Sequence, residues 1–237
     1  MRLTFFLSFI LIATLASSQK ITENTIVKDS SGTIYPASIW RALLVKGGHV
    51  LKPENKDDQN TAFYLVRLTD EEKEARMAKM PAPKESNFFR KGEKFNLGKL
   101  KDITGNEIDL KNNQGKITVV NYWFISCMPC RIEIPDLNNL VTKYASDSVR
   151  FVAIGLDDEE SIKKFVKMLP FSYQLVDDGH YLADRNGVRG YPTHAIIDQE
   201  GKVYFHTTGL STNTVYWLEK SIKELLNKKD PQLSAAK

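Results

Sequence analysis

The chain has 237 residues, of which 42% are hydrophobic and 26% charged, and its formal net charge is +4. This balance excludes a largely disordered or collagen-like chain, and no basic run is long enough to indicate a nucleic-acid partner. The length fits one domain of ordinary size with an additional segment. The sequence contains only two cysteines, Cys127 and Cys130, which excludes a disulfide-dense scaffold and an all-cysteine zinc site.

Residues 1–18 have the pattern of a secretory signal peptide. Arg2 precedes an apolar run, and the segment ends in small residues, Ala16-Ser17-Ser18, that suit a cleavage site before Gln19. The run is short for a membrane span, which needs roughly 20 residues. We therefore expect export to the periplasm or cell envelope, where disulfides persist. An uncleaved signal would instead anchor the protein in the membrane.

Residues 19–85 are expected to form a separate N-terminal region, which contains no cluster of catalytic residue types. Strands are predicted over 21–27, 39–45 and 62–68 from their apolar content and the turn-forming residues between them. A helix is predicted over 70–80, because Thr69 and Glu72 have the spacing of a capping box and Pro81 ends the pattern.

Residues 86–230 show an alternation of strand and helix patterns. A hairpin is predicted over 95–110, and helices over 128–144, 159–169, 181–186 and 214–227. Strands are predicted over 116–124, 150–156, 172–176, 193–197 and 203–207. This order predicts an α/β fold with a central mixed sheet and helices on both faces. Residues 231–237 are left as a C-terminal tail.

The two cysteines lie where a predicted buried strand meets a predicted helix. Cys127 at the helix N-terminus meets free backbone N–H groups and the positive end of the helix dipole, which favour the thiolate. The thiolate is the attacking species in disulfide exchange. Cys127 is therefore the predicted nucleophile. Cys130, one turn further and expected to be more shielded, is the predicted resolving thiol.

The Cys-x-x-Cys motif and the segment Gly190-Tyr191-Pro192-Thr193 together resemble the thioredoxin superfamily. Within it, the chain is similar to the TlpA/ResA-like thiol–disulfide oxidoreductases of bacterial envelopes, over about residues 88–228. The resemblance implies a thioredoxin-like fold with an N-terminal β-hairpin extension. It also implies a cis peptide bond before Pro192, beside the redox disulfide. Tyr191, Pro192 and Thr193 would then bind an extended substrate segment.

Four further positions need separate interpretation. Thioredoxins carry Trp where this chain has Ser126, and a buried acid where it has Asn121, which cannot titrate. Glu133 matches a glutamate that envelope reductases place near the active site, where it would accept a proton or tune the thiols. The alternative for Glu133 is a solvated helix residue or a partner for Arg131. His194 is expected to be a hydrogen-bonded strand residue.

The leading hypothesis is an extracytoplasmic thiol–disulfide oxidoreductase that reduces the disulfides of client proteins through Cys127 and Cys130. Relatives in cytochrome c maturation act in this direction, although Met128-Pro129 within the motif does not determine it. The expected partners are client proteins and an upstream membrane electron donor, and the chain is expected to be a monomer. No cofactor and no metal are expected.

Two alternatives stay open. A thiol peroxidase usually carries Pro and Thr or Ser ahead of its reactive cysteine, whereas Phe124 and Ile125 precede Ser126 here. A binding module with a structural disulfide is the other alternative. It is disfavoured because a disulfide that closes so short a loop gives little chain-entropy stabilisation.

Overall fold

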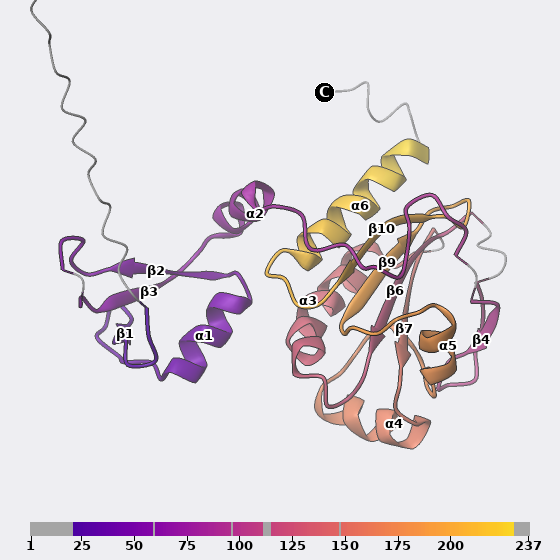
Figure 1. Ribbon diagram of the computed structural model, residues 1–237, viewed down its shortest axis with the longest axis horizontal. Helices are drawn as coiled ribbons and strands as arrows, with labels where there is room; N and C mark the ends of the chain where they lie inside the picture. Colours follow the sequence, from indigo (N-terminus) through magenta and orange to yellow (C-terminus); the bar gives the residue numbers. More distant parts are fainter. Residues whose placement is uncertain (1–20, 59, 96, 111–114, 147, 230–237) are drawn as a thin grey trace, which may run out of the picture. The chain divides into compact units, whose positions relative to one another are not determined.

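The computed structural model describes residues 21–58, 60–95, 97–110, 115–146 and 148–229 (Figure 1). The expected signal peptide and C-terminal tail lie outside these residues. None of the described helices combines the length and the apolar character needed to cross a membrane. The chain divides into two compact units, one of Met1–Leu44 with His49–Arg67 and one of Val45–Gly48 with Leu68–Lys237. Each unit is described by itself.

The first unit contains a three-stranded sheet with the order β1-β3-β2. β3 (Phe63–Arg67) pairs in parallel with β1 (Val27–Lys28) and antiparallel with β2 (His49–Pro53). The predicted strand over 62–68 corresponds to β3, whereas β2 was not predicted and β1 is much shorter than the predicted strand over 21–27. The buried core of this unit consists of Val27, Trp40 and Phe63.

The predicted strand over 39–45 is wrong, because Ala37–Val45 forms helix α1. The Pro36 carbonyl accepts hydrogen bonds from the Ile39 and Trp40 N–H groups at the start of this helix. Trp40 and Leu44, four residues apart, both pack into the core of the unit. Helical spacing on one buried face therefore prevails over the strand preference of the β-branched and aromatic residues.

The second unit begins with helix α2 (Asp70–Lys79), which has the predicted capping box. The Glu72 N–H donates to Thr69 Oγ1 at 3.2 Å, and the Thr69 N–H donates to Glu72 Oε2 at 2.9 Å. The predicted hairpin follows as β4 (Lys99–Lys101) and β5 (Glu107–Asp109), which pair antiparallel. The predicted capping box of α2 and the predicted hairpin are both confirmed.

A five-stranded mixed sheet with the order β10-β9-β6-β7-β8 forms the centre of the second unit (Figure 1). β6 (Ile117–Trp123), β7 (Val149–Gly155) and β8 (Gln174–Val176) run parallel. β9 (Thr193–Ile197) is antiparallel to β6, and β10 (Val203–Thr208) is antiparallel to β9. Every residue of β6 is buried, which explains its continuous apolar sequence.

Helices cover both faces of this sheet, as predicted. Alternate residues of β6 point to opposite faces, so Val119 and Trp123 belong to one core and Val120 and Tyr122 to another. The first core includes side chains of α3 (Met128–Tyr144), α4 (Glu159–Met168) and α6 (Thr214–Lys229). The second core includes α5 (His180–Arg185) and the β4–β5 hairpin. The expected thioredoxin-like architecture is confirmed.

Candidate active site

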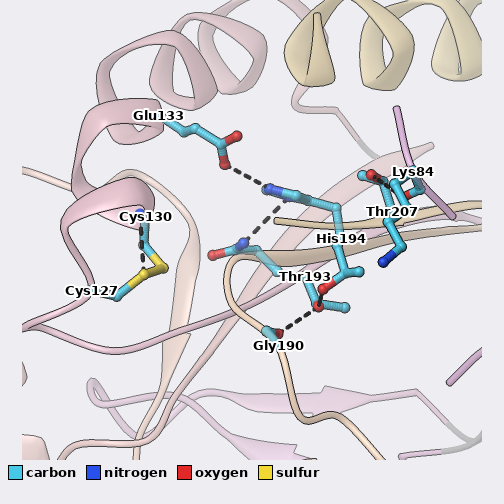
Figure 2. A network of polar contacts seen from close by, with 10 residues as sticks. Lys84, Cys127, Cys130, Glu133, Gly190, Thr193, His194 and Thr207 are labelled. Carbon is cyan, nitrogen blue, oxygen red and sulfur yellow. Dashed lines mark hydrogen bonds and ion pairs between the residues drawn. A yellow bond between two sulfur atoms is a disulfide. The ribbon is translucent and has the colours of Figure 1, made fainter. Parts of the chain in front are cut away.

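Cys127 and Cys130 form a disulfide at the point where β6 leads into α3 (Figure 2). Their Cα atoms are 5.3 Å apart. Cys127 is the N-cap residue of α3, and its Sγ accepts a hydrogen bond from the Cys130 N–H at 3.2 Å. The sulfur of Cys127 therefore occupies the place where a helix N-terminus stabilises negative charge.

The loop that carries Cys127 is held by the adjacent strand. The Ile125 N–H donates to Asp157 Oδ2 at 2.7 Å, and Asp157 lies two residues after the end of β7. The Leu156 N–H also donates to the Trp123 carbonyl at 3.1 Å. These contacts join the carboxyl ends of two parallel strands, so the loop conformation before the first cysteine depends on both.

The two cysteines are almost equally buried, at 5% exposure for Cys127 and 3% for Cys130. Cys130 is the more shielded of the two, as expected, but only by a small margin in the disulfide form. Phe124 and Tyr191 pack edge to face at 5.3 Å, and both lie against the core cluster that contains the two cysteines. Met128, between the cysteines, is 58% exposed.

The predicted substrate-binding strand lies at the start of β9. The Tyr191–Pro192 peptide bond is cis, as the resemblance implies. Pro192 and Thr193 are buried, and Thr193 Oγ1 donates to the Gly190 carbonyl at 2.7 Å and lies 2.8 Å from Thr208 Oγ1. The Thr193 side chain therefore fixes the local backbone. Tyr191 is partly exposed, and burial raises the pKa of its phenol.

Glu133 lies one helical turn after Cys130 and is only 5% exposed. Its Oε2 is 2.8 Å from Nε2 of His194, whereas Oε1 is buried without a hydrogen-bond partner among the described residues (Figure 2). The interpretation of Glu133 as a solvated residue or a partner for Arg131 is therefore wrong. Arg131 is exposed and lies over the ring of Phe165 instead.

His194 is a hydrogen-bonded strand residue, as expected, but the sequence did not identify its partners. It is fully buried on β9, and its Nδ1 lies 3.3 Å from Nδ2 of Asn121. Asn121 and His194 are direct partners across the β6–β9 pair. Asn121 occupies the position where thioredoxins carry a buried acid. His194 therefore links this position to the carboxylate of Glu133 on α3.

Glu133 also lines a cavity of about 590 Å³ in the second unit, between α2, α3 and α6. The walls combine apolar side chains, such as Met77 and Leu140, with charged groups of both signs. Glu133 is therefore placed between the helix turn that carries Cys130 and this cavity.

Comparisons with known proteins agree with this geometry. The chain matches the AhpC/TSA family over residues 92–206. The thiol–disulfide oxidoreductase ResA of Bacillus thuringiensis subsp. konkukian is 32% identical over 146 residues, which are 58% of this chain and 83% of that protein. The ResA of Halalkalibacterium halodurans is 31% identical over 139 residues, which are 55% of this chain and 79% of that protein.

Two solved structures extend the comparison to the fold. The thiol:disulfide interchange protein DsbE from Chlorobium tepidum has a TM-score of 0.54 and 28% identity, covering 58% of this chain and 99% of its own. A protein disulfide isomerase structure from Bacteroides thetaiotaomicron, at 21% identity, shares the fold with a TM-score of 0.55, covering 61% of this chain and 94% of its own. With a redox-type disulfide at a helix N-terminus beside a cis-proline strand, the chain belongs to the ResA-like thiol–disulfide oxidoreductases of the thioredoxin superfamily.

Proposed function

We propose that this protein reduces disulfides of client proteins outside the cytoplasm. The observation that carries the proposal is the Cys127–Cys130 disulfide at the start of α3, next to the cis-Pro192 strand. The signal-type sequence of residues 1–18 supports the location. The similarity to ResA proteins supports disulfide exchange as the reaction.

The reaction proceeds in two exchange steps from the reduced protein. The Cys127 thiolate attacks a client disulfide, so a bond forms between Cys127 Sγ and one client sulfur while the other client sulfur leaves as a thiolate and takes a proton from solvent. Cys130 then loses its proton and attacks Cys127 Sγ. The Cys127–Cys130 bond forms, and the remaining client sulfur leaves as a thiolate and is protonated. Two electrons pass from the protein to the client.

The protein groups around the disulfide have distinct roles in these steps. The N-terminus of α3 stabilises the Cys127 thiolate, and Glu133 accepts the proton of Cys130. The backbone of Tyr191 pairs with an extended client segment, next to the aromatic pair that Tyr191 forms with Phe124. An upstream membrane donor returns the protein to the dithiol form after each turnover.

Mixed-disulfide trapping tests the roles of the two cysteines. In Cys130→Ser the second step cannot occur, so Cys127 should retain its client in a complex that dithiothreitol releases. Cys127→Ser is the matched control and should capture no client. Equal capture by both variants, or by neither, would contradict the assignment.

A redox titration tests the direction of the reaction. Equilibration with dithiothreitol or glutathione should give a potential near the reducing value of thioredoxin, about −270 mV. A potential near that of a strong oxidant, about −120 mV, would show an oxidase instead. Turnover of hydrogen peroxide faster than reduction of a protein disulfide would favour the thiol peroxidase alternative.

A further inference from the structure

We propose that His194 is a positioning residue that holds Glu133 as an ionised proton acceptor for Cys130. This inference rests on the proposed function, because it concerns the proton released when Cys130 attacks the mixed disulfide. His194 does not contact the reacting sulfurs in this proposal. It acts through the carboxylate that it orients.

The hydrogen bonds around His194 determine which ring nitrogen carries the proton. Asn121 Nδ2 is an amide nitrogen and can only donate, so Nδ1 of His194 must accept. The proton of the neutral ring therefore lies on Nε2, which donates to Glu133 Oε2 at 2.8 Å. A donor to a carboxylate favours its ionised form. Asn121, which cannot titrate, thus selects the tautomer that keeps Glu133 available as a base.

The position of Glu133 connects Cys130 with solvent on a second side of the protein. Residues three apart on a helix have Cβ atoms about 5–6 Å apart, so Glu133 and Cys130 share one face of α3. A general base acts directly or through one bridging water. Since Oε2 is engaged by His194, the proton taken up resides on Oε1, which has no partner among the described residues. Glu133 also lines the cavity between the helices, where the proton passes to solvent while a client covers Tyr191.

Other ionisable groups lie around Glu133. The hydroxyl of Tyr173, which precedes β8, is buried, and burial together with the charge of Glu133 raises its pKa. Further ionisable groups that line the same cavity are Lys46 after α1, Asp136 and Lys143 on α3, Tyr216, Glu219, Lys220, Lys223 and Glu224 on α6, and Asp70, Lys73 and Glu74 on α2. Among the described titratable side chains, His194 is the one that a hydrogen bond joins to Glu133.

The proposed step needs only the protein, its client and water. The proton leaves Cys130 Sγ for Glu133, the Cys130 thiolate attacks Cys127 Sγ, and the bond between Cys127 and the client sulfur breaks. The client sulfur departs with the electron pair and takes a proton from solvent. Glu133 then releases its proton to water, so it is unchanged after one turnover.

Ellman's reagent, 5,5′-dithiobis(2-nitrobenzoate), separates the step that involves Glu133 from the first attack. Cys127 releases one coloured thiolate as it attacks, and Cys130 releases the second as it resolves the mixed disulfide. In the wild-type protein, the rate of the second phase should fall at low pH. His194→Phe removes the Nε2–H donor that holds the Glu133 carboxylate in place. The second phase should slow roughly tenfold near neutral pH, within the range of general-base effects, and its pH profile should move to higher pH.

Three variants make the result specific. His194→Gln retains an N–H donor toward Glu133 and should restore most of the wild-type profile. His206→Gln is the matched control, because His206 is also buried on the neighbouring strand but bonds to Ser86. It should leave the profile of the second phase unmoved. In Glu133→Gln the pH dependence of the second phase should be lost, and adding His194→Phe should then change it no further.

The outcomes separate this inference from the proposed function. An unmoved profile in His194→Phe, or an effect of equal size in His206→Gln, would overturn the positioning role while exchange by Cys127 and Cys130 stands. If the wild-type protein released only one coloured thiolate, the proposed function itself would fail. Should His194→Phe not fold, ¹⁵N shifts of the His194 ring in the wild-type protein decide. A proton on Nε2 is expected, and a proton on Nδ1 alone would overturn the proposal.

Discussion

Asp157 links the end of β7 to the loop that carries Cys127. Its Oδ2 accepts the Ile125 N–H at 2.7 Å, and Ile125 lies two residues before Cys127. A hydrogen bond to a charged acceptor contributes about 1.5–3 kcal/mol to stability. Small displacements of a reacting group have large effects on rate. Asp157 therefore matters more for the placement of Cys127 than its distance in sequence indicates.

Replacing Asp157 with alanine should slow disulfide exchange by Cys127 by about tenfold to a hundredfold, since the loop loses its anchor. The rate of the first phase with Ellman's reagent measures this. Asp158→Ala is the matched control, because the neighbouring Asp158 caps α4 through Ser161 and does not hold the loop. Its expected effect is a stability loss of about 1 kcal/mol without slower exchange. Equal slowing in both variants would contradict the role of Asp157.

Motif spacing is sufficient to predict Cys127 and Cys130, and the family resemblance adds Pro192, but neither gives the partners of Glu133. Each of the first three residues belongs to a short local pattern whose chemistry depends on a turn or a helix start. The contact between Glu133 and His194 joins residues 61 positions apart. It depends on the register of β9 against β6 and on the rotation of α3 over the sheet, and neither quantity is encoded in a local pattern.

At the scale of secondary-structure elements, Glu219 connects α3 with α6. It accepts hydrogen bonds from Lys143 and Tyr144 of α3, and Lys223 of α6 pairs with it at 2.9 Å. Burial by itself raises the pKa of Glu219, but hydrogen bonds from Lys143, Lys223 and Tyr144 outweigh it and lower the pKa to about 2. The carboxylate is therefore more stable in the folded than in the unfolded protein.

The lowered pKa of Glu219 predicts that the folded protein loses stability in acid. Because the folded pKa lies below the ordinary value, 4.5, the contribution is present above that pH and disappears as the pH falls toward 2. Glu219→Gln should lower the free energy of unfolding at neutral pH by about 1–3 kcal/mol and flatten its dependence on pH in this window. Denaturant unfolding across the window measures both. Glu224→Gln, on the same helix as Glu219, removes a hydrogen bond from Tyr204 of β10 and should leave the slope intact.

Helices with strong end signals were predicted closely, whereas α1 was not. Helix α3 spans Met128–Tyr144, as predicted, because a proline lies in its first turn and a continuous strand precedes it. Helix α1 was predicted as a strand, since Ile39, Trp40 and Val45 favour strands locally. Pro36 at its start and the spacing of Trp40 and Leu44 were the available signals. The segment 37–45 could form a short strand or a short helix, and the burial of one helical face in the core favours the helix.

At the scale of the whole chain, the two units differ greatly in the size of their cores. The first has a buried core of three residues, Val27, Trp40 and Phe63, whereas two large clusters lie on the faces of the second unit's sheet. The described part of the first unit, within 21–44 and 49–67, has only about 40 residues, and a unit this small is only marginally stable. The first unit should therefore unfold at lower temperature than the second.

Trp40→Ala should abolish the lower thermal transition while leaving disulfide exchange intact. Truncating a buried tryptophan costs about 3–5 kcal/mol, which is comparable with the whole stability of so small a unit. Scanning calorimetry measures the transitions, and Ellman's reagent measures exchange in the same samples. Trp217→Ala is the matched control, because Trp217 stacks on Phe205 within the second unit and should shift only the upper transition. A single transition that both variants move together would show that the units unfold as one. Loss of exchange in Trp40→Ala would show that the active site depends on the first unit.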